Sequence, residues 1–307
     1  MIRSAVAAPA ERRARRAASA LEVLWRFSRP HTVIGTTVSI VGLYLIAVDE
    51  GIAPGVGDLA LTLLAGLCVN VYIVGINQLE DVEIDRVNKP YLPIAAGDMT
   101  REQGRVLVAA AGIVPVALAL TQGPFELAAV LAGLAVGTAY SVPPLRLKRF
   151  PALASLSISG VRSVVVNLGV FAHFGTPIPA PVWALTLFVV PFAFAIAILK
   201  DVPDIEGDRR FRVMTLSVRM GARRVFEIGL AALVAAYLGM AAIGPLAIGS
   251  ADPVVLVAGH LAALALLWRF SRGADVADHE SFTRFYMRVW KLFFLEYAIV
   301  ALACLAG

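Results

Sequence analysis

Residues 77–93 read NQLEDVEIDRVNKPYLP and place polar side chains directly after an apolar segment. Asn77, Asp81 and Asp85 are four residues apart, so in a helix they share one face. The preceding residues, 59–76, are almost wholly apolar. The stretch therefore predicts a hydrophobic helix that ends in a cluster of polar and acidic side chains.

A second segment, residues 200–210, repeats this arrangement with the sequence KDVPDIEGDRR. It follows the apolar run 183–199 and contributes Asp201, Asp204 and Asp208. Two acidic clusters at equivalent helix ends indicate a shared task, the binding of cations. Mg²⁺ is usually held by one or two carboxylates together with water and substrate phosphates. The pattern predicts two Mg²⁺ ions between the clusters.

The composition is that of a membrane protein. Of 307 residues, 59% are hydrophobic, and the mean hydropathy is +0.79, whereas soluble domains are roughly 45–50% apolar. Runs of about 20 apolar residues recur, each long enough to cross about 30 Å of hydrocarbon. Cys68 and Cys304 both lie in apolar runs, so we expect no disulfide, and the four histidines lack metal-ligand spacing.

The apolar runs predict an all-α integral membrane protein with nine transmembrane helices. These cover residues 30–48, 59–76, 102–120, 125–140, 153–174, 181–200, 225–248, 254–268 and 284–305. Residues 1–20 are predicted to form a basic, disordered tail, with a transit peptide as the alternative. Residues 21–307 are predicted to form one domain.

The distribution of basic residues predicts the orientation. With nine spans and a cytosolic N-terminus, 26 of the 27 Lys and Arg residues fall on the cytosolic side, where short loops collect positive charge. The C-terminus is then outside and both acidic clusters face the cytoplasm. This topology accounts for the net charge of +5 without a nucleic-acid partner. The Ala-, Val- and Arg-rich composition favours a bacterial inner membrane.

The remaining basic residue, Arg162, lies within the fifth predicted helix, about nine residues or roughly 13 Å from its cytosolic end. A charge at this depth is costly and usually faces a cavity or a partner. We predict contact with an anionic substrate or a buried acid. The structural alternative is an arginine that binds a helix-end carbonyl or extends its stem toward the interface. Trp25, Trp268 and Trp290 are predicted to lie at the membrane interfaces.

The residue types around the acids predict the substrate. Two Mg²⁺ ions would relieve the repulsion between the carboxylates and neutralise a diphosphate. Basic side chains would bind the rest of its charge, and the predicted set is Lys200, Arg146, Lys148, Arg209 and Arg162. The apolar helices suit a hydrocarbon tail, so we expect an isoprenyl diphosphate whose allylic cation an electron-rich acceptor captures.

Several other polar residues have two interpretations. Tyr140 and Ser141 are predicted to bind phosphate or the acceptor, or to be an interfacial tyrosine and a turn serine. Asn167 either contacts a substrate or holds neighbouring helices together. The acids that lie between the spaced ones are expected to face solvent, and they are Glu80, Glu83 and Glu206.

The two acidic segments resemble the aspartate motifs of the UbiA superfamily of membrane prenyltransferases. Residues 77–93 resemble the first motif, and DVPDIEGD at 201–208 resembles the second. The NKPYLP and DIEGD stretches, and Gln78 directly after the motif Asn, are most similar to the homogentisate prenyltransferase branch. The resemblance implies nine helices around a central cavity that opens to the cytosol, and Mg²⁺ bound by Asn77 and the five aspartates. It also implies C-prenylation of a phenolic, homogentisate- or hydroxybenzoate-like acceptor.

Alternative functions fit the same motifs less closely. A terpene cyclase without an acceptor, or a prenyltransferase with a non-aromatic acceptor, stays open, as do the prenyl chain length and the oligomeric state. A transporter would place its ion-binding acids near the membrane midplane. A lipid head-group transferase would show an Asp-Gly start with a downstream Ala-Arg pair, which this sequence lacks.

Overall fold

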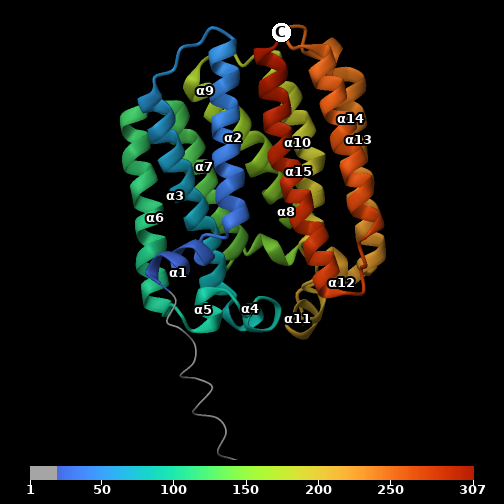
Figure 1. Cartoon of the computed structure of the whole chain (residues 1–307). Helices are drawn as coiled ribbons and strands as arrows, with labels where there is room; N and C mark the ends of the chain where they lie inside the picture. The colour runs from blue at the N-terminus through green and yellow to red at the C-terminus, as the bar shows by residue number, and fades with distance from the viewer. Residues whose placement is uncertain (1–18) are drawn as a thin grey trace, which may run out of the picture.

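A computed structural model describes residues 19–307, and the regular structure of this part of the chain is entirely helical (Figure 1). The predicted basic tail falls, except for its last two residues, outside the described range. The long helices are α2 (Pro30–Asp49), α3 (Val56–Glu80), α6 (Arg101–Gln122), α7 (Pro124–Ser141), α10 (Ala180–Leu199), α13 (Ala222–Ala247), α14 (Pro253–Arg272) and α15 (His279–Leu305).

One further long rod is built from three consecutive pieces. These are α8 (Pro151–Gly160), the π-helix η2 (Val161–Val170) and α9 (Phe171–Phe174). Together they correspond to the predicted helix 153–174. A π-helical segment is rare, and such segments are often found at functional sites.

Eight of these rods, α15 being the exception, are long and apolar enough to cross a membrane. α15 is also long, but its apolar sequence is interrupted by three charged residues, Arg288, Lys291 and Glu296. It packs along α2, α14 and α10. The prediction of an all-helical integral membrane protein is confirmed, and the count of nine spans stays a prediction.

Local sequence explains where the helices begin. Proline occupies the first helical position, where a missing N–H is harmless, at Pro30, Pro124, Pro151 and Pro253. α6 begins with a capping box, in which Thr100 and Gln103 bind each other's backbone N–H groups. Every long helix begins and ends within about five residues of the predicted bounds.

Short helices gather at one end of the bundle, opposite the chain's C-terminus (Figure 1). They are α1 (Ala20–Phe27), α4 (Val82–Asn88), α5 (Pro93–Ala96), α11 (Ile205–Arg210) and α12 (Leu216–Met220), and a 3₁₀ turn, η1 (Leu147–Arg149), lies in the loop between α7 and α8. α1 was not predicted. It buries Phe27 and exposes Leu21 and Trp25, as an amphipathic helix at a membrane surface does.

The packed core lies around α10, whose residues are mostly buried against α13, α8, η2 and α15. Trp290, predicted at the membrane interface, instead lies inside and is 2% exposed, so that prediction is wrong. The reason is its position on the face of α15 that packs toward α2 and η2. Trp25 and Trp268 are exposed. Cys68 and Cys304 are free thiols, as predicted.

Candidate active site

A cavity of about 780 Å³ opens near the short helices and extends between α2, α3, α7, the α8–η2 rod and α10. Its volume lies within the range of about 300–1,000 Å³ that is common for ligand pockets. The interior is largely apolar, with side chains that include Ile40, Val69, Ile73, Val130, Val136, Ile158, Val165, Val166 and Ile196. The mouth is polar and charged. The cavity therefore has separate regions for a charged group and for a hydrocarbon.

The first acidic cluster lies at this mouth, although not on one unbroken helix. α3 ends at Glu80, and Asp81 is the junction to α4. The Asp81 N–H donates to the Asn77 carbonyl at 3.0 Å and the Asp85 N–H to the Asp81 carbonyl at 2.8 Å, so the four-residue relationship is kept. Asn77, Asp81 and Asp85 all line the cavity, as the spacing predicted.

The second cluster lies at the same mouth. Asp201 is in the turn after α10, Asp204 is the N-cap residue of α11, and Asp208 lies within α11. All three line the cavity. The intervening acids Glu83 and Glu206 are exposed, in agreement with the prediction. Glu80 is also exposed.

Asn88 joins the two clusters and was not identified from the sequence. Its Nδ2 donates to Asp208 Oδ1 at 3.3 Å, and its Oδ1 accepts the Gly207 N–H at 3.1 Å. The asparagine is itself a cavity-lining residue and is buried. α4 and α11, which lie side by side in Figure 1, are joined by both polar atoms of this amide and by an ion pair between Lys89 and Asp204.

Basic side chains neutralise the acids. Asp81 accepts from Arg146 Nη2 at 3.1 Å and from Lys148 Nζ at 2.6 Å. Lys200 Nζ donates to Asp201 Oδ1 at 2.6 Å. The same kind of pair joins two further residues, Lys89 and Asp204.

The mouth therefore combines acids with the predicted diphosphate-binding residues Arg146, Lys148 and Lys200. Lys89 was not predicted to belong to the site. The sequence feature that could have identified it is its position in the NKP segment, directly after the first motif.

Burial raises the pKa of three acids at the mouth, Asp85, Asp201 and Asp208. It raises the pKa of Asp85 to about 6, against the opposing effect of Arg29 and Lys89. It raises the pKa of Asp208 to about 7, and Asp201 and Asp204 add to this shift by repulsion. Each acid would be stabilised in its charged form by a nearby cation.

The donor set fits a divalent cation. Asp85 is 3% exposed, and its Oδ2 is buried without a hydrogen-bond partner. Within residues 19–307, no group of three or more His, Cys, Asp or Glu side chains is placed so that it could hold a metal ion by itself. Mg²⁺ does not require one, because it keeps waters and takes substrate phosphate oxygens beside one or two carboxylates. Asn77 and the motif aspartates are the residues that would hold it.

Three arginines at the cavity have a backbone conformation that L-residues rarely adopt. Arg29, Arg146 and Arg212 have φ angles of 54°, 38° and 58°, and they are the only non-glycine residues with positive φ in the described chain. All three line the cavity. Such conformations cost of order 1–3 kcal/mol each and occur preferentially at functional sites.

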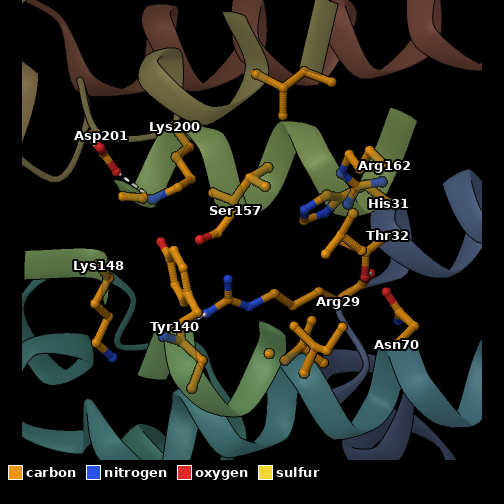
Figure 2. A pocket seen from close by; sticks show the side chains of 18 of the residues that line it. Arg29, His31, Thr32, Asn70, Tyr140, Lys148, Ser157, Arg162, Lys200 and Asp201 are labelled. Carbon is orange, nitrogen blue, oxygen red and sulfur yellow. Dashed lines mark hydrogen bonds and ion pairs between the residues drawn. The ribbon is translucent and has the colours of Figure 1, made fainter. Parts of the chain in front are cut away.

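The remaining predicted residues differ in whether they line the cavity. Tyr140 lines the cavity beside Lys200 and Lys148, and Arg29 extends across the pocket toward it (Figure 2). Ser141 does not line the cavity; it is fully buried, and its Oγ accepts from Asn77 Nδ2 at 3.5 Å. Arg162 lines the cavity farther inside.

Two further predicted residues are not brought to the cavity. Arg209 is exposed and lines a separate pocket on the surface of α11. Asn167 is fully buried and its Oδ1 accepts a hydrogen bond from Tyr297 Oη at 2.7 Å, so it connects η2 to α15.

A polar mouth with paired acids and bases above an apolar chamber, within a bundle of membrane-spanning helices, suits an amphiphile with an anionic head group and a hydrocarbon tail. The chain belongs to the UbiA prenyltransferase family, whose model matches residues 36–292.

Relatives extend over nearly the whole chain. A homogentisate phytyltransferase from Synechocystis sp. is 47% identical over 92% of this chain and 96% of its own. A chloroplastic homogentisate solanesyltransferase from Arabidopsis thaliana is 38% identical over 90% of this chain and 75% of its own. These matches confirm the predictions of a prenyltransferase of this family and of isoprenyl transfer to an aromatic acceptor.

Solved structures with 18% identity show the same fold. A digeranylgeranylglyceryl phosphate synthase superposes with a TM-score of 0.66, covering 94% of this chain and 99% of the other. A UbiA homologue from Archaeoglobus fulgidus, bound to GPP and Mg²⁺, superposes with a TM-score of 0.63, covering 91% of this chain and 99% of the other.

Proposed function

We propose that the protein transfers a C20-class isoprenyl group from its diphosphate to the ring of homogentisate or a similar aromatic acid. The observation that carries the proposal is the single cavity that joins both acidic motifs to a long apolar chamber. The similarity to homogentisate phytyl- and geranylgeranyltransferases supports the acceptor and the tail. The two acidic clusters and the Mg²⁺-bound relative support a divalent cation, in our proposal two Mg²⁺ ions.

The charged mouth would bind the diphosphate. Asn77, Asp81 and Asp85 on one side, and Asp201, Asp204 and Asp208 on the other, would hold the cations. Bound Mg²⁺ neutralises the charge that develops on a departing diphosphate. Arg146, Lys148 and Lys200 already lie against these acids and would move their N–H groups to phosphate oxygens. We assign Tyr140, which lies beside Lys200, to the same region.

The apolar chamber would hold the isoprenyl chain and exclude water. When the allylic C–O bond breaks, its electron pair leaves with the diphosphate, and the electron-rich aromatic ring supplies the pair for the new C–C bond. The ring then loses a proton to restore its aromaticity. An allylic cation that met water would be hydrolysed, so the dry walls formed by Val165, Val166 and Ile196 protect the reaction.

The proposed orientation places the mouth in the cytoplasm. Both acidic motifs and the Arg- and Lys-rich loops lie at the same end of the bundle, and the C-terminus lies at the other (Figure 1). The positive-inside rule then assigns the charged end to the cytosolic face, in our proposal that of a bacterial inner membrane. Residues 21–307 would form the single catalytic domain.

The test is product analysis with purified protein. Homogentisate is incubated with Mg²⁺ and phytyl, geranylgeranyl or solanesyl diphosphate, and products are identified by mass spectrometry. We expect a prenylated quinol with a C20 chain, and its mass shows whether CO₂ is lost. A terpene formed without any acceptor would contradict the proposal and support a cyclase. Equal turnover of the C45 substrate would contradict the chain length.

A further inference from the structure

The cavity contains a guanidinium group that no acid neutralises. Arg162 lines the chamber, but it forms no ion pair or hydrogen bond with any residue between 19 and 307. Every lysine at the mouth, and Arg146, is paired with an aspartate. An unpaired charge deep in a membrane-spanning helix is costly, so an arginine that faces a cavity in this state is suited to an anion that arrives from outside the chain.

Aromatic packing fixes the direction of this arginine. Its guanidinium carbon lies 4.5 Å from the Trp290 ring centroid and 5.7 Å from that of Phe293. His31 packs edge-on against the same tryptophan, with centroids 4.9 Å apart. Arg162 and His31 are neighbours on one side of the pocket in Figure 2, away from Lys148, Lys200 and Asp201. The tryptophan thus keeps the guanidinium at the cavity surface and apart from the diphosphate region.

The depth of Arg162 separates it from the mouth. It lies eleven residues into the rod that begins at Pro151, which corresponds to roughly 16 Å at α-helical rise. It belongs to the π-helical segment η2, the one such segment in the described chain. Glu126 is the only cavity-lining acid of the described chain outside the two motifs, and no ion pair joins it to Arg162.

We propose that Arg162, supported by Trp290 and with His31 beside it, binds the carboxylate of the aromatic acceptor. This inference rests on the proposed function, since it requires an acceptor that is an acid. A guanidinium matches the planar carboxylate with two parallel N–H donors. It would hold the acceptor inside the chamber while the diphosphate stays with the acids and lysines at the mouth. Arg162 is then a specificity residue for the acceptor and not a ligand of the diphosphate.

The experiment compares an acid with its neutral ester in three forms of the protein. Wild type, Arg162→Met and Arg162→Lys are assayed with homogentisate and with homogentisate methyl ester, and KM is determined separately for the prenyl diphosphate. Arg272→Gln is the matched control, because Arg272 also lies over a tryptophan, 4.8 Å from the Trp268 ring, but outside the cavity. Homogeneity on gel filtration in detergent shows that each variant is folded.

In wild type we expect the ester to have a KM about 10- to 100-fold above that of the acid, the range that a lost charged hydrogen bond produces. In Arg162→Met this preference disappears, because only the KM of the acid rises, and in Arg162→Lys part of the preference remains. The KM of the diphosphate is unchanged, and Arg272→Gln behaves as wild type.

Other outcomes would show whether the inference about Arg162 or the proposed function is wrong. If Arg162→Met raises the KM of the diphosphate and affects acid and ester equally, the arginine belongs to the diphosphate site. If wild type uses acid and ester equally well, the inference is wrong while the proposed function stands, and this result needs no folded variant. If wild type prenylates neither compound, the proposed function itself is wrong.

Discussion

Asn88 and Asp208 are 120 residues apart in the chain, yet the amide of one hydrogen-bonds to the carboxylate of the other at the mouth of the cavity. The same asparagine accepts the N–H of Gly207, so both of its polar atoms bind α11. Each acidic motif is carried by a short helix, and neither helix is long enough to be stable alone. The asparagine and the Lys89–Asp204 ion pair together hold the two motifs at a fixed distance, and both contribute to the geometry in which a diphosphate would be held.

Replacing Asn88 by alanine should loosen this contact. The change leaves a buried Asp208 oxygen and the Gly207 N–H without partners, which costs about 1–3 kcal/mol. We expect kcat/KM for the prenyl diphosphate to fall at least about 10-fold, with a higher Mg²⁺ requirement. Steady-state kinetics at several Mg²⁺ concentrations measure both effects.

A glycine on the other side of the contact supplies an independent variant. A Cβ on Gly207 would lie 2.0 Å from Asn88 Oδ1. Gly207→Ala should therefore lower kcat/KM and raise the Mg²⁺ requirement, as expected for Asn88→Ala. Gly239→Ala is the control, because Gly239 is also helical and nothing lies within 4 Å of its Cβ position. Full activity of Gly207→Ala at low Mg²⁺ would show that the contact does not set the geometry.

Asp81 and Asp204 are predicted to be essential. Asp81→Asn and Asp204→Asn keep the size of the side chain but lose the charge that Lys148 and Lys89 face. We expect turnover to fall by at least about 100-fold, as when a major electrostatic contribution to a transition state is lost, while the protein still inserts and purifies as a single species.

The matched control is Glu83→Gln, which lies within the first motif but on the surface, paired with Arg86 and Arg101. Its activity should equal that of wild type. Near-normal activity of either aspartate variant would remove that residue from the proposed metal site.

Metal removal should make stability depend on pH. In the folded protein, burial raises the pKa of Asp85 to about 6 and of Asp208 to about 7, above the ordinary value of 3.8. Below about pH 4 their contribution to stability is fully present, and it is lost as the pH rises through about 6 and 7. Protein treated with EDTA should therefore be less stable at pH 8 than at pH 5.

Added Mg²⁺ should reverse this loss. Since the cation binds the deprotonated acids, it competes with protons and stabilises most at high pH. At 100 times its dissociation constant it contributes about 2.7 kcal/mol, so the melting temperature should rise clearly at pH 8 and little at pH 5. Equal shifts at both values would exclude Asp85 and Asp208 as the binding groups.

Gly133 should limit the space for the isoprenyl chain. It lines the cavity on α7, seven residues or about 10 Å from Tyr140 at the charged end, and a Cβ there would meet Val69 at 2.9 Å. Gly133→Leu should therefore reduce kcat/KM for geranylgeranyl diphosphate about 10-fold or more relative to geranyl diphosphate. Competition between the two substrates, read by mass spectrometry, measures the ratio. An unchanged ratio would show that the isoprenyl chain does not pass Gly133.

Some features of the site could be found from local sequence and others could not. The four-residue spacing of Asn77, Asp81 and Asp85 predicts a common face, because backbone hydrogen bonds continue through Asp81 even where α3 gives way to α4. Asn88 carries no such pattern, since its partners are distant in the chain. Arg209 stands beside Asp208 in sequence but points to the surface, because adjacent residues on a helix lie on different faces.

The sequence alone determined the membrane class, the helix positions and the end at which the acids gather, because hydrophobic length, charge distribution and short spacings are local properties. Only the tertiary structure decided which polar groups meet. It paired Asp81 with Lys148, joined Asn88 to Asp208, and placed Trp290 beneath Arg162 instead of at the membrane surface. These contacts depend on the rotation and packing of helices that are distant in the chain, which no single segment encodes.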